Sequence, residues 1–226
     1  MNNKLLSFAF IVIVLLTLSV YFFGAEKNYR AFGKQLEVSH ILYKPNEPLL
    51  DFSLLDHNNK PFTNENLKGN WTLMLFIYTH CPDVCPTELF DMAQLKKLME
   101  KQGMNAPKVV VVTLDPLRDT PEVLKQYVSH FDKDFLGVTG QKTQIDKLIK
   151  PFGAYYERVI NDKDGKQFIL KADDKLPKSA LKQGYIINHT AWIYLINPEG
   201  QIFAGFPTPH KASKMAVDIK LITDTF

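Results

Sequence analysis

Residues 71–86 read WTLMLFIYTHCPDVCP, an apolar run that ends in two cysteines separated by three residues. The run is bounded by Gly69-Asn70 before it and by the cysteine segment after it. A short, nearly continuous apolar run of this kind predicts a strand that is buried on both faces. The stretch therefore predicts an α/β fold in which Cys81 and Cys85 follow the end of a central strand.

The remaining segments extend this pattern to a thioredoxin-like fold, with a central mixed sheet flanked by helices. A turn at 57–60 separates two short strands, and a polar, lysine-rich insert is expected at 162–184. One helix is expected to bury Val123, Tyr127 and Phe131 on one face. Strands are expected at 51–55, 71–78, 108–113, 191–196 and 201–206, and helices at 86–102, 121–131, 142–152 and 211–221.

Residues 5–23, LLSFAFIVIVLLTLSVYFF, predict an N-terminal transmembrane helix. As a helix this run would be about 28 Å long, close to the ~30 Å hydrocarbon core of a bilayer. A cleaved signal peptide is the alternative, but the run is long for one, and Phe23 stands where cleavage after Ala25 requires a small residue. We therefore expect a membrane anchor in residues 1–24, a tether in 25–47 and a thioredoxin-like domain in 48–226.

Charge and compartment set further limits on function. The chain carries 27 basic and 24 acidic residues, interspersed, for a net charge of +3. This balance is too even to indicate nucleic acid as a partner. If the N-terminus stays inside the cell, the anchor places the domain in an exported, oxidising compartment, where neighbouring cysteines can form a disulfide.

Cys81 and Cys85 are the two cysteines of the chain. Pro86 favours an extended backbone at Cys85 and suits the first position of a helix, so 81–85 is expected to be a loop that leads into a helix N-terminus. There the helix dipole and free backbone N–H groups stabilise a thiolate. The pair is open to three interpretations: a soft-metal site, a reversible disulfide, or both in turn.

A metal site would require a third ligand, because two thiolates alone bind a metal poorly. His189 directly precedes the strand expected at 191–196, an edge that faces the cysteine loop in a thioredoxin-like sheet. His80 is adjacent to Cys81, and adjacent side chains point apart. Two thiolates and an imidazole suit Cu(I), whereas structural zinc takes four protein ligands. The other histidines are expected on solvated loops or helix surfaces: His40, His57, His130 and His210.

Asp115, Arg118 and Asp119 lie in a second loop at the same edge of the predicted sheet. Their ordinary role would be turn and cap chemistry, with Thr120 or Asp119 capping the helix that Pro121 begins. An alternative is that Asp115 and Arg118 orient the site or contact a partner.

Three motifs resemble the Sco/SenC family of copper chaperones for cytochrome c oxidase assembly. They are THCPDVCPTEL at 79–89, VTLDPLRDTPE at 112–122, and NHT at 188–190 with YLINPEG at 194–200. The resemblance covers about residues 48–221 and the N-terminal anchor. It is specific because the three motifs occur in order and at the right spacing, whereas the cysteine pair alone is a weak signal.

The resemblance implies a thioredoxin-like copper-binding domain with Cys81, Cys85 and His189 as ligands of Cu(I) or Cu(II). It implies a carrier, not an enzyme, that delivers copper to the dinuclear copper site of a cytochrome c oxidase subunit, with a copper donor protein or a thiol reductant as a further partner. It also implies a single-pass protein of the inner membrane, with its domain on the periplasmic side, or in the mitochondrial intermembrane space in a eukaryote.

One departure concerns Asn188, since many members carry Asp before the histidine. An amide does not raise the basicity of an imidazole as a carboxylate does, so a weaker ligand is expected at His189. The alternative function is a thiol–disulfide oxidoreductase that reduces the copper-site cysteines of its partner, which needs the cysteine pair but not His189. A peroxidase is disfavoured, because Thr79 lies two residues before Cys81, not three.

Overall fold

The computed structural model describes residues 8, 10–14, 29–44, 47, 49–161, 165–171 and 174–226. The chain divides into two units, Met1–Leu36 and Glu37–Phe226. Residues 8, 10–14 and 29–33 of the first unit are helical, and the other residues of the predicted anchor lie outside the described residues. None of the helices within the described ranges combines the length and hydropathy that a bilayer crossing requires.

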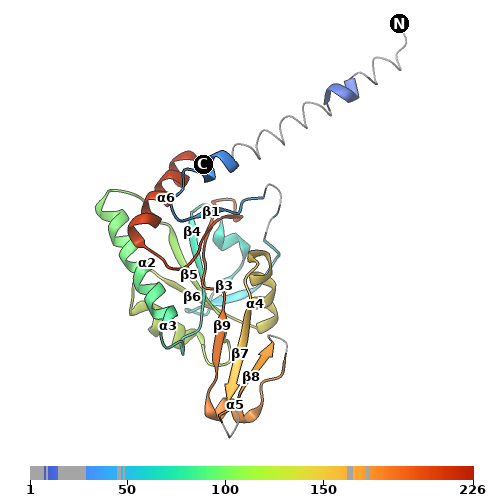
Figure 1. Ribbon diagram of the computed structural model, residues 1–226, viewed down its shortest axis with the longest axis vertical. Helices are drawn as coiled ribbons and strands as arrows, with labels where there is room; N and C mark the ends of the chain where they lie inside the picture. The colour runs from blue at the N-terminus through green and yellow to red at the C-terminus, as the bar shows by residue number, and fades with distance from the viewer. Residues whose placement is uncertain are drawn as a thin grey trace. The chain divides into compact units, whose positions relative to one another are not determined.

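The second unit contains two β-sheets with helices around them (Figure 1). Its first strand falls in the segment expected to be a tether. Its described elements are, in chain order, β1 (His40–Ile41), β2 (Leu54–Asp56), β3 (Pro61–Phe62), the 3-10 helix η1 (Asn64–Leu67), β4 (Thr72–Ile77), α2 (Val84–Lys101), β5 (Lys108–Thr113), α3 (Pro121–Ser129), β6 (Leu136–Thr139), α4 (Lys142–Ile149), the 3-10 helix η2 (Lys150–Phe152), β7 (Tyr156–Asn161), β8 (Gln167–Lys171), α5 (Lys178–Gln183), β9 (Ile186–His189), β10 (Ile193–Ile196), β11 (Ile202–Phe206) and α6 (Ala212–Thr225).

The main sheet is mixed, as the sequence predicts. Among the described residues its strand order is β1-β11-β10-β4-β5-β6-β2-β3. Strands β4, β5 and β6 run parallel, with Thr72 opposite Lys108, whereas β10 runs antiparallel to β4, with Ile193 opposite Leu75. All six residues of β4 are buried, which confirms the central, two-sided strand expected from its apolar run. Helices α2 and α6 pack side by side (Figure 1).

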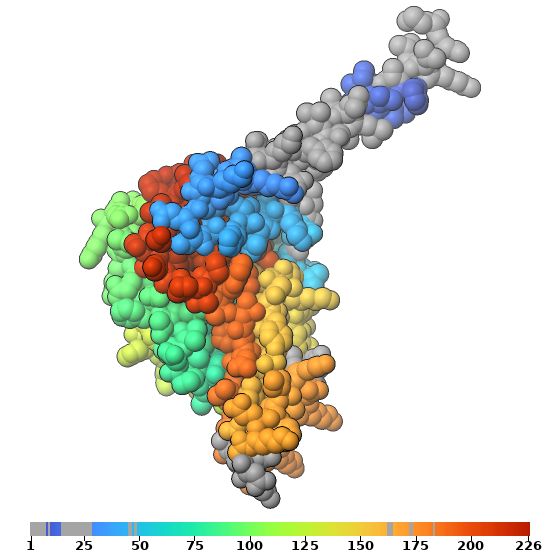
Figure 2. All heavy atoms as spheres, viewed as in Figure 1, coloured from blue at the N-terminus to red at the C-terminus, as the bar shows by residue number. Residues whose placement is uncertain are grey.

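A second sheet, of order β8-β7-β9, occupies the region between η2 and β10 and is absent from the sequence prediction. Tyr156 of β7 pairs with His189, the last residue of β9. Most residues of β8 are exposed, although its sequence contains the apolar run 168–170 within the lysine-rich segment expected to be an insert. Together with α5 these strands form a projection at one end of the unit, coloured yellow to orange in Figures 1 and 2.

Two details of the predicted helices were wrong. Helix α2 begins at Val84, so Cys85 lies in its first turn and Pro86 is its third residue. A proline is tolerated there because the first N–H groups of a helix have no intrahelical partner. Helix α3 buries Leu124 and Val128, not the face expected from Val123.

Strand β6 was missed, and Gly137 within it explains why. A glycine inside a short run signals a turn more often than a central strand. Here a Cβ at Gly137 would lie 3.0 Å from Cβ of Leu124, tighter than ordinary van der Waals contact. The residue is therefore a glycine because α3 packs closely against the strand.

Candidate metal centre

The cysteine segment is a turn that becomes the first turn of α2. The N–H of Cys81 donates to the carbonyl of Tyr78 at 3.2 Å, which reverses the chain after β4. The N–H of Cys85 then donates to Sγ of Cys81 at 3.4 Å. This N–H is one of the helix donors without an intrahelical acceptor, so the helix terminus itself contacts the sulfur. Both cysteines are free thiols; Cys81 is partly exposed and Cys85 is fully buried.

His189 reaches the same point from the second sheet. Its Nε2 lies 3.5 Å from Sγ of Cys85, although 104 positions separate them in the sequence. The ring of Tyr78 stands edge-on to the imidazole, with the centroids 6.2 Å apart. The fold thus brings together the three residues that the sequence singled out, Cys81, Cys85 and His189.

The hydrogen bonds of His189 determine which ring nitrogen carries the proton. Nδ1 lies 3.1 Å from the carbonyl oxygen of Thr190. A carbonyl oxygen only accepts hydrogen bonds, so Nδ1 holds the hydrogen and Nε2 presents a lone pair. The thiol of Cys85 therefore faces a nitrogen that can accept a proton or bind a metal ion.

The two thiols differ strongly in acidity. Hydrogen bonding from the Cys85 thiol lowers the pKa of Cys81 well below its usual range; burial opposes this, and the backbone N–H groups of Cys85 and Asp83 add to it. The same sharing of a proton raises the pKa of Cys85, and burial raises it further. These directions make Cys81 the more acidic thiol of the pair.

Among the described residues, the side chain of Asn188 forms no hydrogen bond to the imidazole of His189. Its Nδ2 donates instead to Oε1 of Glu157, at 3.2 Å. The carbonyl of Thr190 takes the place at Nδ1 that a carboxylate would otherwise fill. Because a backbone carbonyl is also a common orienting partner of a ligating histidine, the orientation of the ring is set without residue 188.

The remaining histidines differ in part from expectation. His80 is 54% exposed and its Nδ1 lies 3.1 Å from Oγ1 of Thr79, so it points away from the cysteine pair, as expected. His40 and His130 are exposed, also as expected. The surface assignment was wrong for His57, which is buried, and for the side chain of His210, which is 2% exposed. Gly137 donates its N–H to Nδ1 of His57.

A buried carboxyl group that sequence reasoning missed lies one helical turn after Cys85. Glu88 is 4% exposed, and its Oε1 accepts no hydrogen bond from the described residues. Nδ1 of His210 lies 3.7 Å from this oxygen, and Nε2 of His210 donates to the carbonyl of Phe206 at 3.1 Å. Burial raises the pKa of Glu88 to about 7 and lowers that of His210.

We expect the substitution Glu88→Gln to stabilise the protein more at pH 8 than at pH 5. Glu88 has an ordinary pKa of 4.5, and its folded-state pKa of about 7 is higher, so its contribution to stability is full below pH 4.5 and is lost as the pH rises through 7. The free energy of unfolding of Glu88→Gln, relative to that of the native chain, should rise by about 2–3 kcal/mol between pH 5 and pH 8. Urea unfolding at both pH values measures it.

Glu100→Gln, an exposed position on the same helix, is the matched control and should show no such trend. The groups that face Glu88 are His210, His189, Cys81, Cys85, Asp91 and Tyr127. An advantage of Glu88→Gln that is equal at pH 5 and pH 8 would contradict the raised pKa.

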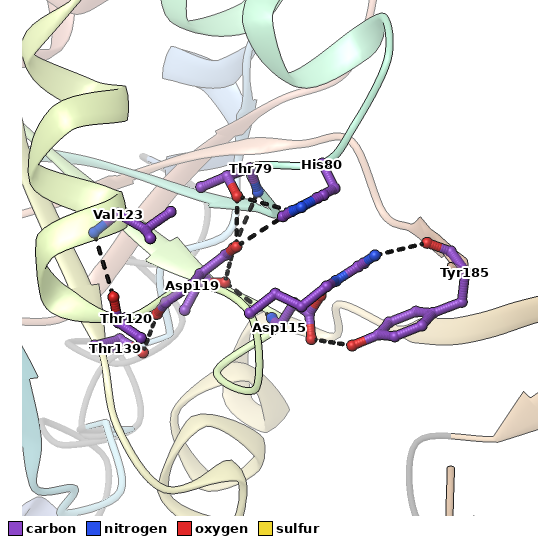
Figure 3. A network of polar contacts seen from close by, with 10 residues as sticks. Thr79, His80, Asp115, Asp119, Thr120, Val123, Thr139 and Tyr185 are labelled. Atoms are coloured by element: carbon purple, nitrogen blue, oxygen red, sulfur yellow. Dashed lines mark hydrogen bonds and ion pairs between the residues drawn. The ribbon is translucent and has the colours of Figure 1, made fainter. Parts of the chain in front are cut away.

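The loop between β5 and α3 also lies at this edge of the sheet. Thr120 is the cap of α3, since its side chain accepts from the N–H of Val123. Asp119, for which a capping role was expected, is fully buried and bonds to Thr79 and Thr113 instead (Figure 3). Tyr185, which directly follows the polar insert expected at 162–184, bonds to Asp115 of the same loop.

The spacing of Glu88 from Cys85, three residues on one helix, would have been a usable signal for its proximity to the site. No local sequence signal marked Tyr185, because 70 positions separate it from Asp115, the residue that it contacts.

A central parallel strand, a dithiol at the start of the following helix and an imidazole from a later strand define a thioredoxin-like protein with a dithiol–imidazole site. The chain belongs to the SCO1/SenC family, whose model matches residues 44–224.

Relatives of known sequence and structure agree with this assignment. The SCO2-like protein of Rickettsia felis is 35% identical over 156 residues, which cover 69% of this chain and 67% of that protein. Bradyrhizobium japonicum ScoI, solved with copper bound, is 34% identical, with a TM-score of 0.58 over 76% of this chain and 96% of that one. Yeast Sco1, also solved with copper bound, is 28% identical, with a TM-score of 0.65 over 78% and 88%.

Proposed function

We propose that this protein is a copper metallochaperone that binds copper through Cys81, Cys85 and His189. The observation that carries the proposal is the approach of a metal-competent Nε2 of His189 to the Cys85 thiol, at 3.5 Å, beside a Cys81 sulfur that accepts a helix N–H. Two thiolates and a neutral imidazole suit Cu(I), and an imidazole and thiolates also accept Cu(II). Copper-bound structures of two similar proteins support this choice of metal.

The three proposed ligands are close together, but they do not have the geometry of a metal-bound site. Within the described ranges, no group of three or more His, Cys, Asp and Glu side chains is spaced to hold an ion. Copper would displace the proton of Cys85 and draw the two sulfurs and the imidazole inward. A three-ligand site with a partly exposed Cys81 is suited to transfer, because an incoming thiolate can enter before a bound one leaves.

Membership of the family supports the destination of the metal. We propose that the protein delivers copper to the dinuclear copper site of a cytochrome c oxidase subunit, and that a donor protein loads it. Residues 5–23 would anchor it, with the copper site on the exported side of the membrane. Delivery by ligand exchange needs no catalytic residue, so the protein would act as a carrier.

Metal analysis of the purified, reduced chain after loading with Cu(I) tests the proposal. We expect close to one equivalent of tightly held copper for the native chain and none for the double substitution of Cys81 and Cys85 by serine. Serine keeps the volume of each side chain but removes the soft ligand. Equal copper content in the two proteins would overturn the proposal.

A thiol–disulfide oxidoreductase is the second candidate, and the unequal acidity of the two thiols favours it. The Cys81 thiolate would attack a disulfide of the partner to form a mixed disulfide. The Cys85 thiol would then lose its proton and attack Cys81, which releases the partner as a dithiol and leaves the Cys81–Cys85 disulfide. Equilibration with glutathione measures its reduction potential; a value far below that of glutathione, with activity retained in His189→Ala, favours this function.

A further inference from the structure

Two halves of the candidate metal centre come from different sheets. The cysteine turn follows β4 in the main sheet, whereas His189 ends β9 in the second sheet. Strands β4 and β9 share no ladder of backbone hydrogen bonds, but β10, which begins four residues after His189, pairs with β4, with Ile193 opposite Leu75. That pairing ties the C-terminal end of β9 to β4, and contacts at the N-terminal end of β9 set the rest of its position.

The loop between β5 and α3, residues 114–120, contacts both halves, and we name it the bracing loop (Figure 3). Its first arm is Asp119, which is fully buried. The carboxylate accepts from the N–H of Thr79 at 3.0 Å, from Oγ1 of Thr79 at 2.5 Å and from Oγ1 of Thr113 at 2.6 Å. Since Thr79 lies two residues before Cys81, this arm holds the start of the cysteine turn.

The second arm is formed by Asp115 and Arg118 and holds Tyr185, the residue before β9. Oδ1 of Asp115 accepts from the hydroxyl of Tyr185 at 2.5 Å, and its Oδ2 accepts from Nε of Arg118. Nη1 of Arg118 donates to the carbonyl of Tyr185 at 3.1 Å. The guanidinium also lies over the Tyr185 ring, 3.6 Å from its centroid. Both the backbone and the side chain of Tyr185 are therefore fixed.

The two arms are rigidly connected to each other. The N–H of Asp119 donates to the carbonyl of Asp115 at 2.9 Å. The N–H of Asp115 donates to Oγ1 of Thr113 at 2.8 Å, and that hydroxyl donates in turn to Asp119. The Asp119 carboxylate is thus joined through one hydroxyl to the backbone of Asp115, and one turn joins the two residues as well, so a shift of one arm disturbs the other.

We propose that the bracing loop sets the position of His189 relative to the cysteine pair, with Asp119 and Tyr185 as positioning residues. The inference rests on the proposed copper site and names the residues that hold His189 and the cysteine pair in place. Asp115 and Arg118 act through Tyr185 on the imidazole side, and Asp119 acts through Thr79 on the thiol side. Because one loop serves both sides, thiol and imidazole keep their separation while the site is empty of copper.

Tyr185→Phe tests the imidazole arm, because it removes one hydroxyl and keeps the ring. We expect at least a tenfold loss of Cu(I) affinity in competition with a chromophoric chelator, with the reduction potential of Cys81–Cys85 unchanged. Tyr155→Phe is the matched control, since Tyr155 also bonds a carboxylate, Glu157, but is 57% exposed. It should leave the affinity unchanged. Equal affinities of the two variants would overturn the imidazole arm.

Asp119→Asn tests the thiol arm and should shift both the copper affinity and the reduction potential, since it loosens the turn that carries Cys81. If this variant fails to fold, Thr79→Val removes one of the three bonds and should give a smaller shift of the same kind. A reduction potential unchanged in the folded variant would overturn this arm. A merely structural role would lower the stability of the protein but leave both readouts unmoved.

Failure of the proposed function can be told apart from failure of this inference. If the native chain binds no copper, the copper-carrier function is wrong. The reduction potential then still decides the thiol arm, and the ring ¹⁵N chemical shifts of His189 in metal-free Tyr185→Phe decide the imidazole arm. Shifts that move away from those of the native chain support positioning, and shifts that do not move overturn it.

Discussion

Replacing His189 with alanine is expected to weaken Cu(I) binding by about 100-fold or more, because even loss of an outer partner of a metal ligand costs about 10- to 100-fold. Nε2 of His189 faces Cys85 at 3.5 Å, so alanine removes the proposed nitrogen ligand and leaves the two sulfurs. Competition with a chromophoric Cu(I) chelator measures the loss. For Cu(II), the absorption of the thiolate–copper bond should change as well, because the imidazole no longer completes the site.

His80→Ala is the control for this experiment. His80 is nearer to the cysteines in the sequence, but its imidazole bonds to Thr79 and is directed toward Asp119 (Figure 3). We expect its copper affinity to stay close to that of the native chain. Full retention of copper by His189→Ala, or a larger loss in His80→Ala, would show that the wrong imidazole has been assigned.

Asp218→Ala is expected to destabilise the folded chain by about 3–5 kcal/mol, the largest effect on stability that we predict. Asp218 is fully buried on α6 and accepts hydrogen bonds from the N–H groups of Glu37, Val38 and Ser39, at 2.8, 2.9 and 2.8 Å. Oγ of Ser39 donates a fourth, at 2.8 Å. These donors lie directly before β1, and alanine leaves them buried without an acceptor. The free energy of unfolding in urea measures the loss of stability.

Asp224→Ala, on the same helix, provides the comparison. Asp224 accepts from Lys220 in an exposed ion pair, so its loss should change stability by less than about 1 kcal/mol. An Asp218→Ala variant as stable as Asp224→Ala would mean that the segment 37–39 contributes nothing to the folded unit.

The sequence predicted most strands of the main sheet, β6 excepted, because those strands carry strong signals. Strand β5 has the predicted bounds, 108–113, and the hairpin of β10 and β11 surrounds the predicted turn. Strands β7, β8 and β9 were missed because they lie within or beside the polar, lysine-rich segment 162–184, whose composition masked their brief apolar runs. His57 and His210 were placed at the surface because burial of a single polar residue depends on distant partners, Gly137 and Glu88 here.

The amino-acid sequence by itself determined the central strand, the dithiol at its end and the three candidate ligands, since apolar periodicity and motif spacing are local properties. Only the tertiary structure decided which atoms meet. The second sheet delivers Nε2 of His189 to Cys85, Thr190 selects the tautomer, and Glu88 and Tyr185 join the surroundings of the site. Such contacts join residues far apart in the chain, and their geometry follows from packing between elements, which no local pattern encodes.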